Sequence, residues 1–241
     1  MKLKYFLMRV LTGLSSEFRL LIKRFVMARI RLGMTGLEID DTEGLSYGQT
    51  VRKFKSYEHY VRHQVTKAKF LSGWKEGRVT HFRTEFMSSK CLSKVGENET
   101  VLCVGARFGE EVSVLRDMGY LALGIDLNPE KRNKFVFFGD VHQIEFSNGV
   151  FDKIFCNVLD HVLDIEKALL EIARVLKSPG HLVIHIQRQE PGEFEVRGWD
   201  SAEKFAERIG MFFGVQPSIT DRGNFVEAVF LLTGLGQARG N

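Results

Sequence analysis

Residues 101–126 read VLCVGARFGEEVSVLRDMGYLALGID, and this stretch decides the fold. The apolar run Val101–Val104 is typical of a buried strand and leads directly into the glycine loop Gly105–Gly109. The amphipathic stretch Glu110–Met118 predicts a helix, and the apolar run Leu121–Ile125 predicts a second strand. A glycine where a strand ends lets backbone amides approach a ligand, and the N-terminus of the next helix offers N–H groups to it. We therefore expect a ligand site at the glycine loop.

Further apolar runs follow this unit, separated by amphipathic stretches; they are Phe135–Phe138, Phe151–Val158, Leu182–Ile186, Val215–Thr220 and Phe225–Thr233. The stretches Asp164–Lys177 and Ser201–Phe213 have helical spacing. Asp164 is placed as the N-cap of the first helix and Lys177 against the dipole of its C-terminus, and Asp200 or Ser201 is placed as the N-cap of the second. A turn at 221–224 predicts an antiparallel hairpin at the end of the chain. Alternating strands and helices predict an α/β fold with a doubly wound, mostly parallel sheet.

The composition excludes several classes of protein. The chain has 241 residues, 44% of them apolar and 27% charged, which is typical of one full-size globular domain with a short appendage. Charged residues interrupt every apolar run, so we expect no membrane-spanning helix. Three cysteines without a C-x-x-C pair argue against a disulfide framework and a zinc site. His59 and His63 lie four residues apart without nearby acids, so no metal site is expected.

The charge is unevenly distributed. Residues 1–34 hold eight basic residues and one acid, a net charge of +7, whereas the whole chain carries +4. Within them, the stretch Phe18–Leu32 predicts a basic amphipathic helix. Such a helix could lie on an anionic membrane surface, or it could dock on its own domain or on a protein partner. The expected compartment is the cytoplasm, with peripheral membrane attachment as an open alternative.

We expect three regions along the chain. Residues 1–34 form the basic amphipathic helical extension, residues 35–98 a helical lead-in that caps the substrate, and residues 99–241 the ligand-binding core. The lead-in is rich in aromatic residues between Ser46 and Lys75, which predicts either a lid over the site or ordinary packing.

Acidic residues end the next two predicted strands. Asp126 follows Gly124 and Ile125, 21 residues after Gly105, where a carboxylate can accept the hydroxyls of a ribose. Asp140 follows the third predicted strand. Because parallel strands end at one edge of a sheet, a glycine loop and two acids at successive strand ends predict a site for an adenosine. The G-x-x-x-G spacing differs from the G-x-G-x-x-G of dinucleotide binding, which argues against an NAD enzyme.

The motifs VLCVGARFGEEV, LGIDLNP, GDVHQIEFSNGVFDKIFCNVLDHV and EIARVLKSPGHLVIHI resemble those of class I S-adenosylmethionine-dependent methyltransferases, in particular the type 11 methyltransferase domain. The resemblance covers about Phe82 to Thr233 and implies a Rossmann-like, seven-stranded sheet ending in an antiparallel hairpin. It implies an enzyme with S-adenosyl-L-methionine as cofactor and S-adenosyl-L-homocysteine as product. The implied cofactor-binding residues are Gly105, Ala106, Arg107, Gly109, Asp126, Leu127, Asp140, Val141 and Asn157.

The sequence departs from this family in two places. The family's D-x-G-x-G-x-G becomes Cys103–Gly109, without the acid and the middle glycine. Arg107 stands in that loop, where its guanidinium could pair with the carboxylate of the cofactor or its bulk could narrow the site; we favour the pairing. Only Leu127–Lys134 separates the second and third strands, so the helix usual at that position must be reduced to a turn.

Methyl transfer from a sulfonium is an in-line displacement that leaves a neutral thioether, so the protein mainly supplies alignment and desolvation. An acceptor hydroxyl or ammonium must also lose a proton, and histidine titrates in the useful range. His161 is the candidate base, with Asp160 or His185 as its orienting partner or substitute. The alternative is that His161 only hydrogen-bonds a loop carbonyl.

The expected acceptor is a small molecule, such as a sugar, a glycan precursor or a lipid-linked metabolite, because the compact chain offers no separate RNA-binding domain. Two other functions stay open. The chain could be a non-catalytic subunit with a methyltransferase fold that binds partners through residues 1–34, or those basic residues could guide RNA to the site. The confinement of the positive charge to one end argues against nucleic acid.

Overall fold

The computed structural model describes residues 38–40, 50–70, 77–130, 133–188, 195–199 and 201–233. The chain divides into two units, 1–38 and 39–241, and the structure below is that of the second. The predicted helical extension 1–34 lies outside the described residues. In the described ranges no helix has the length and apolar character needed to cross a bilayer.

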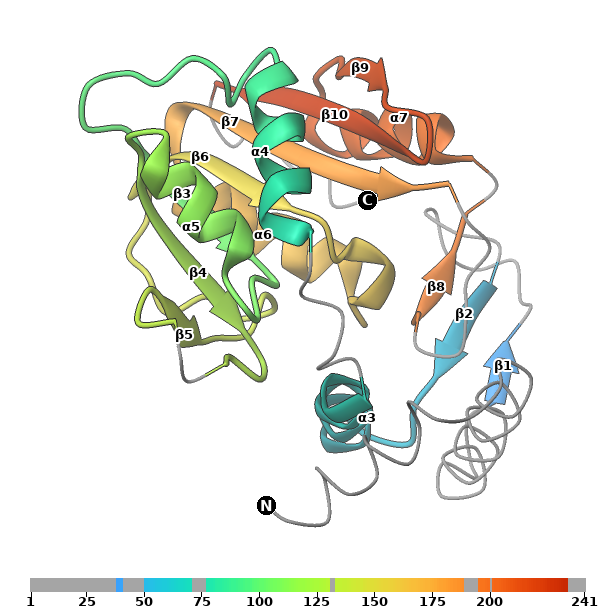
Figure 1. The fold of residues 1–241 in the computed structure, drawn as a ribbon. Coiled ribbons are helices and arrows are strands. Elements are labelled where there is room, and N and C mark those ends of the chain that lie inside the picture. The colour runs from blue at the N-terminus through green and yellow to red at the C-terminus, as the bar shows by residue number, and fades with distance from the viewer. Residues whose placement is uncertain are drawn as a thin grey trace, which may run out of the picture. The chain divides into compact units, whose positions relative to one another are not determined.

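A seven-stranded sheet forms the centre of the fold, with strands in the order β5-β4-β3-β6-β7-β10-β9 (Figure 1). Neighbours from β5 to β7 are parallel, whereas β10 runs antiparallel to both β7 and β9. This arrangement confirms the predicted mostly parallel sheet with its terminal hairpin. The strands are β3 (Thr100–Val104), β4 (Leu121–Asp126), β5 (Val136–Phe138), β6 (Phe151–Cys156), β7 (Leu176–Gln187), β9 (Ser218–Asp221) and β10 (Phe225–Leu232).

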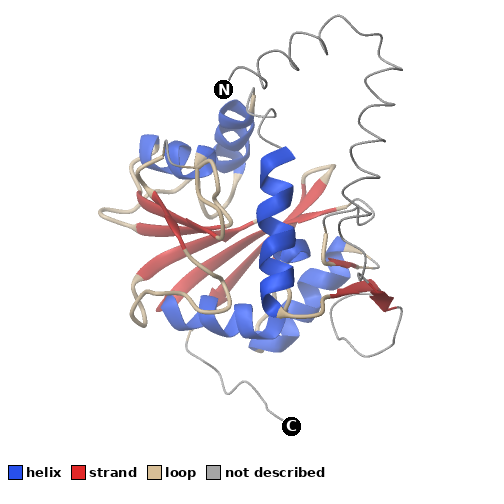
Figure 2. Cartoon of the chain, turned by 90° about the horizontal axis from the view of Figure 1, so that it is seen from below, coloured by secondary structure: helices blue, strands red, loops and turns tan. Residues whose placement is uncertain are grey.

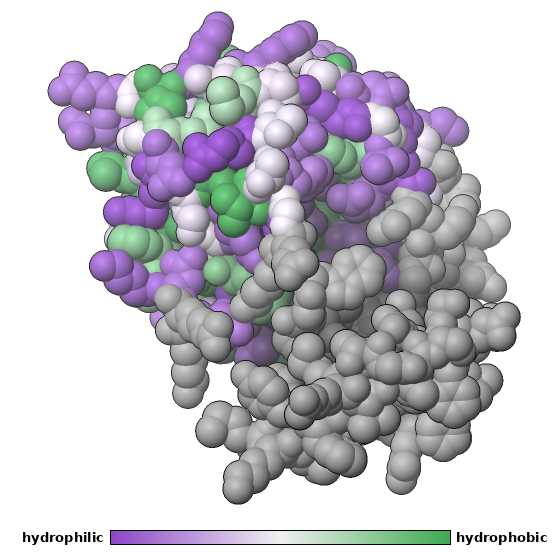
Figure 3. Space-filling model, in the orientation of Figure 1, coloured by the Kyte–Doolittle hydropathy of each residue, from purple (hydrophilic) through white to green (hydrophobic). Residues whose placement is uncertain are grey.

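Helices cover both faces of this sheet (Figure 2). One apolar cluster joins the sheet to α4 (Arg78–Ser88) and α5 (Glu110–Asp117). The other joins it to α6 (Ile165–Val175) and α7 (Ala202–Phe213), which Figure 1 shows behind the strands. The described surface facing the viewer in Figure 3 is mostly hydrophilic, with scattered apolar residues. The doubly wound core therefore matches the sequence pattern.

The N-caps of α6 and α7 lie at predicted positions. The carboxylate of Asp164 accepts a hydrogen bond from the Lys167 N–H at 3.0 Å, and the Ser201 hydroxyl accepts one from the Lys204 N–H at 3.0 Å. Each cap satisfies an N–H group that has no partner inside its helix. These bonds fix the first turns of the two helices.

The predicted end of α6 is wrong by two residues. The helix ends at Val175 and β7 begins at Leu176, which pairs with Phe151 of β6. Lys177 therefore lies in a strand instead of opposing the helix dipole, and its ammonium contacts the Asp152 carboxylate at 2.9 Å. Pairing with β6 supplies backbone hydrogen bonds immediately, so the chain enters the sheet without a turn.

A small second sheet has the strand order β1-β2-β8, with β1 (Glu38–Asp40), β2 (Thr50–Lys53) and β8 (Arg197–Gly198). Residues 35–98 were expected to be helical, and they contain α3 (Tyr57–Phe70) and α4 but also β1 and β2. The antiparallel pairing of β2 with β8 joins residues almost 150 positions apart in sequence, so no local pattern predicts it.

Candidate cofactor-binding cleft

A cleft of about 250 Å³ lies at the carboxyl ends of β3, β4 and β6. This is the edge at which open α/β sheets bind ligands. The strand-end loops, α3 and the start of α4 form its walls. Eight residues proposed from the sequence line it, namely Gly105, Ala106, Arg107, Asp126, Leu127, Val141, Asn157 and His161. Gly109, Asp140, Asp160 and His185 were also proposed and do not line it.

The glycine loop begins with a backbone turn that only glycine adopts easily. Gly105 has φ +79° and donates its N–H to the Ile125 carbonyl at 2.8 Å. A Cβ atom on this residue would lie 2.3 Å from Cγ1 of Val158. Gly109, with φ +74°, precedes α5, and a Cβ there would lie 2.0 Å from Nδ2 of Asn133. Both glycines are required by a positive φ and by a close neighbour.

Asp126 is hydrogen-bonded to the loops that follow β3 and β4, two neighbouring strands. Its carboxylate accepts hydrogen bonds from the Asn128 N–H at 2.7 Å and from the Arg107 N–H at 3.3 Å. Asp126 ends β4, beside the glycine loop that follows β3. A carboxylate has four lone-pair sites, so the same group is suited to bind ribose hydroxyls.

Two arginines line the same cleft. The Arg107 guanidinium lies 4.5 Å from the centre of the Phe108 ring, and Arg78 contributes a second guanidinium from the first residue of α4. Burial lowers the pKa of Arg107, and the carboxylate of Asp126 partly opposes this shift. A guanidinium remains charged throughout the physiological range, so both arginines are suited to bind a carboxylate.

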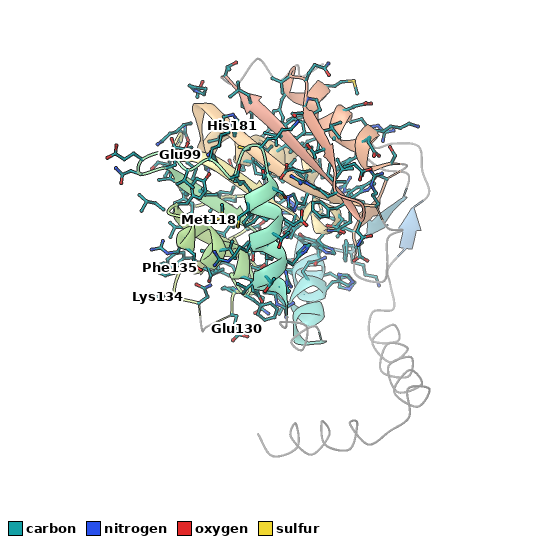
Figure 4. The ribbon with its side chains drawn as sticks, turned by 45° about the horizontal axis from the view of Figure 1, so that its top comes forward. Glu99, Met118, Glu130, Lys134, Phe135 and His181 are labelled. Atoms are coloured by element: carbon teal, nitrogen blue, oxygen red, sulfur yellow. The ribbon has the colours of Figure 1, made fainter. Side chains whose placement is uncertain are left out.

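The connection between β4 and β5 contains no helix in its described residues, 127–130 and 133–135, as the short spacing predicts. Glu130 donates its N–H to the Arg107 carbonyl at 2.8 Å, and the Asn133 amide donates to the Gly109 carbonyl at 3.1 Å. In Figure 4 Glu130 and Lys134 lie together at the edge of the molecule, near Phe135. The connection is therefore hydrogen-bonded directly to the glycine loop.

The family resemblance implies that Asp140 reads the adenine, and in the structure its carboxylate is engaged by His142 and Tyr57. One carboxylate oxygen accepts from the N–H of His142 at 2.9 Å and lies 2.7 Å from Nδ1 of the same residue, and the other accepts from the Tyr57 hydroxyl. Burial alone would raise the pKa of Asp140, but the hydrogen bonds from His142 and Tyr57 hold it below its usual value. Asp140 thus ties α3 to the sheet, while its neighbour Val141 lines the cleft.

His161 and Asp160 lie in a single turn, Leu159–His161, that follows β6. Nε2 of His161 lies 3.6 Å from Oδ2 of Asp160. The Tyr60 hydroxyl donates to the backbone carbonyl of His161 at 3.0 Å, which fixes this turn against α3. His161 lines the cleft, whereas Asp160, its neighbour in this turn, does not.

His185 lies elsewhere, between the sheet and α4. It is 6% exposed, its ring centre is 4.4 Å from that of Phe225, and its Nε2 is 3.5 Å from the carboxylate of Glu227. Burial lowers the pKa of His185, and Glu227 partly opposes this effect. Since His185 does not line the cleft, we do not retain it as a partner of His161.

Sequence analysis missed several residues of the cleft, which are Tyr60, Gln64, Arg78, Phe108, Asn128, Val158 and Val162. Phe108 and Asn128 belong to loops that the sequence already assigned to the site, so their position in these loops could have identified them. Tyr60 and Gln64 lie four residues apart and therefore on one face of α3. Nothing local indicates which face of α3 or which end of α4 meets the sheet.

The strand order, the glycine loop after β3 and the acid that ends β4 are those of the class I S-adenosylmethionine-dependent methyltransferase fold that the sequence resembles. Sequence comparison agrees, because residues 102–184 match the family described as methyltransferase domain. This match agrees with the methyltransferase fold that the sequence predicts. An uncharacterised protein of Methanocaldococcus jannaschii is 34% identical over 112 residues, covering 44% of this chain and 49% of that protein. The chain thus spans about half the length of this relative.

Solved structures share the fold at low identity. A 1,6-didemethyltoxoflavin-N1-methyltransferase of Burkholderia thailandensis, bound to 1,6-didemethyltoxoflavin and S-adenosylhomocysteine, matches with TM-score 0.55 and 16% identity over 76% of this chain and 95% of its own. A SAM-dependent methyltransferase of Thermotoga maritima matches with TM-score 0.53 and 17% identity over 72% and 99%. One from Aquifex aeolicus matches with TM-score 0.51 and 20% identity over 70% and 97%. These likenesses concern the fold alone.

Proposed function

We propose that this protein transfers a methyl group from S-adenosylmethionine to a small-molecule acceptor. The observation that carries the proposal is the cleft itself, which gathers Gly105, Arg107, Asp126 and His161 at one edge of the sheet. Its volume of about 250 Å³ lies just below the range of about 300–1,000 Å³ that is usual for small-molecule sites. The Burkholderia methyltransferase acts on a small heterocycle, which supports a small acceptor here.

Each part of the cofactor has a proposed binding group. Gly105 and Ala106 bring the backbone close to the methionine part, and Asp126 binds the ribose hydroxyls. Arg107 and Arg78 pair with the methionine carboxylate, since a guanidinium suits a planar anion. Leu127 and Val141 lie beside the adenine, and Asn157, just after β6, faces the reacting methyl group.

The reaction is an in-line displacement in which the acceptor's lone pair attacks the methyl carbon and the neutral thioether leaves. Holding the two reactants in line supplies much of the rate enhancement. We propose that the Asp160–His161 pair activates the acceptor, because His161 lines the cleft and Asp160 lies 3.6 Å from its ring. In the simplest mechanism His161 takes the acceptor's proton as a general base.

The acceptor that we propose is a sugar, a glycan precursor or a lipid-linked metabolite. Tyr60, Gln64 and His161 place polar groups along one side of the cleft, which suits a hydroxylated acceptor. A screen of metabolite extracts with S-adenosylmethionine labelled in its methyl group would identify the product.

We also propose that the protein attaches to a membrane surface. This part of the proposal is based only on the positive charge of residues 1–34. Each basic residue near an anionic headgroup layer adds about 1 kcal/mol of binding. We expect the full chain to co-sediment with vesicles containing phosphatidylserine and a chain lacking residues 1–34 to remain in the supernatant. Equal sedimentation of both chains would exclude this role.

Replacing Asp126 with alanine tests the ribose assignment. The carboxylate would lose charge-assisted hydrogen bonds to the cofactor and its bonds to both loops, so S-adenosylhomocysteine should bind more weakly by about 1.5–3 kcal/mol. Calorimetric titration measures the change, with Asp117→Ala as the control. Asp117 pairs with Arg83 on the exposed surface at 2.6 Å, and its loss should leave the affinity unchanged. Unchanged affinity in Asp126→Ala would remove this residue from the cofactor site.

A further inference from the structure

We propose that Asp160, His161 and Glu195 bind a divalent metal cation at the edge of the cofactor cleft. This cation would coordinate an oxygen atom of the acceptor. This inference rests on the proposed methyl transfer and refines how the acceptor is activated. One ligand atom from each residue lies within 4.8 Å of the other two, and all three residues are partly buried. The set was invisible in the sequence because 33 positions separate His161 from the segment that carries Glu195.

The two segments that carry these groups are fixed to each other. The N–H of Val196, next to Glu195, donates to the Asp160 carbonyl at 2.7 Å. The Arg197 guanidinium donates to the Leu163 carbonyl at 2.8 Å. Val196 and Arg197 are 1% and 3% exposed, so this join lies in the interior. Ligands held on a buried base keep their spacing, which is a requirement of a metal site.

The spacing of the donors suits a cation. Nε2 of His161 and Oδ2 of Asp160 are 3.6 Å apart, beyond the usual length of a hydrogen bond. Two ligands of one cation with bonds of about 2.1 Å are separated by roughly 3.0–3.4 Å in octahedral or tetrahedral geometry. Small side-chain rotations therefore bring these two atoms and the Glu195 carboxylate to coordinating distance.

The donor set indicates which cation fits. One imidazole and two carboxylates give a mixed nitrogen and oxygen site with a charge of −2, which a divalent cation neutralises. Carboxylates suit Mn²⁺ and Mg²⁺, and the imidazole shifts the preference toward a first-row transition metal. We therefore assign Mn²⁺. Three protein ligands leave positions open for an acceptor, and one of the three, His161, lines the cleft.

The cation would change the role of His161. A hydroxyl held by a divalent cation has a lowered pKa and releases its proton to water. The oxygen then forms the new bond to the methyl carbon, and the carbon–sulfur bond breaks with its electron pair going to sulfur, which leaves neutral S-adenosylhomocysteine. His161 acts as a ligand in this scheme instead of taking the proton itself. The acceptor class is accordingly a hydroxylated molecule.

Titration of the full chain with Mn²⁺ tests the site directly, by the loss of the paramagnetic resonance signal of the free ion and by calorimetry. We expect one ion per chain with a Kd below about 100 μM. Glu195→Gln and Asp160→Asn keep the side-chain shapes but remove charged ligands, so each should weaken binding by at least about tenfold. Glu166→Gln is the matched control, because Glu166 is exposed on α6 and is not one of the three proposed ligands, so its loss should leave Mn²⁺ binding unchanged.

S-adenosylhomocysteine titration of the same proteins separates this inference from the proposed function. All variants should bind the cofactor product as the native chain does. Mn²⁺ that fails to bind, or binds Glu195→Gln and Asp160→Asn as well as the native chain, overturns the metal site. Failure of S-adenosylhomocysteine to bind the native chain would instead overturn the methyltransferase assignment. In the labelled-methyl screen, EDTA should abolish transfer; undiminished transfer would leave His161 as a direct base without a cation.

Discussion

Between pH 5 and pH 8 we expect the free energy of unfolding of the native chain to decrease. In the Glu111→Gln variant most of this decrease should be absent. Glu111 is 2% exposed in the first turn of α5, and burial raises its pKa to about 8 from an ordinary 4.5. Between these two values the folded chain keeps the proton and the unfolded chain has released it. Stability therefore falls as pH rises through this window, by about 3–4 kcal/mol in total. Glutamine stays neutral and removes that loss.

Denaturant unfolding at pH 5 and pH 8 measures the difference for the native chain, Glu111→Gln and the exposed control Glu166→Gln. The free energy of unfolding of the control should change with pH as it does in the native chain. An equal pH dependence in Glu111→Gln would show that the Glu111 carboxyl ionises normally. At pH 8 the variant should also be more stable than the native chain, because no buried charge has to form.

Gly105→Ala should destabilise the fold and weaken cofactor binding together. The positive φ alone costs an alanine about 1–2 kcal/mol, and the overlap with Val158 adds about 1–3 kcal/mol if the loop holds its place. If the loop moves to relieve the overlap, the bonds from Gly105 and Ala106 to the Ile125 carbonyl are disturbed. Either response distorts the part of the cleft that we propose binds the methionine part of the cofactor.

Gly149→Ala provides the matched control for the backbone strain. Gly149 has φ +64° with no atom within 4 Å of an added Cβ, so this variant carries the strain without the overlap. Its free energy of unfolding should fall by about 1–2 kcal/mol, with the affinity for S-adenosylhomocysteine unchanged. The double variant Gly105→Ala with Val158→Ala should recover part of the affinity. If Gly105→Ala lowered the free energy of unfolding and the affinity for S-adenosylhomocysteine no more than Gly149→Ala does, Val158 would not confine the loop.

Much of the fold follows from local sequence. Apolar runs located the strands because a strand buried on both faces has no polar alternation, and Asp164 and Ser201 marked helix starts because their side chains cap the first turn. The exact end of α6 did not follow, because pairing of Leu176 with Phe151 decides it. Long-range pairing is absent from any local pattern.

The site was predictable where it depends on strand ends and not where it depends on packing. Gly105 and Asp126 line the cleft because parallel neighbours end at one edge. Asp140 also follows a strand, but Tyr57 and His142 engage its carboxylate, and this contact needs α3 to be placed first. Arg78, the first residue of α4, also lines the cleft, and its position likewise depends on where that helix packs. The position of a loop after a parallel strand determines whether that loop lines the cleft. Tertiary contacts determine which side chains of the loop point into it.

The short connection before β5 has a consequence for how molecules of this protein meet one another. The described part of this connection holds no helix, and the outer strand of the sheet, β5, displays Phe137 and Phe138, which are 49% and 69% exposed. A long flat edge with such side chains would recruit a strand from a neighbouring molecule. With only three residues, β5 offers too few backbone groups to template that addition. The short length of β5 therefore protects this exposed edge of the sheet against aggregation.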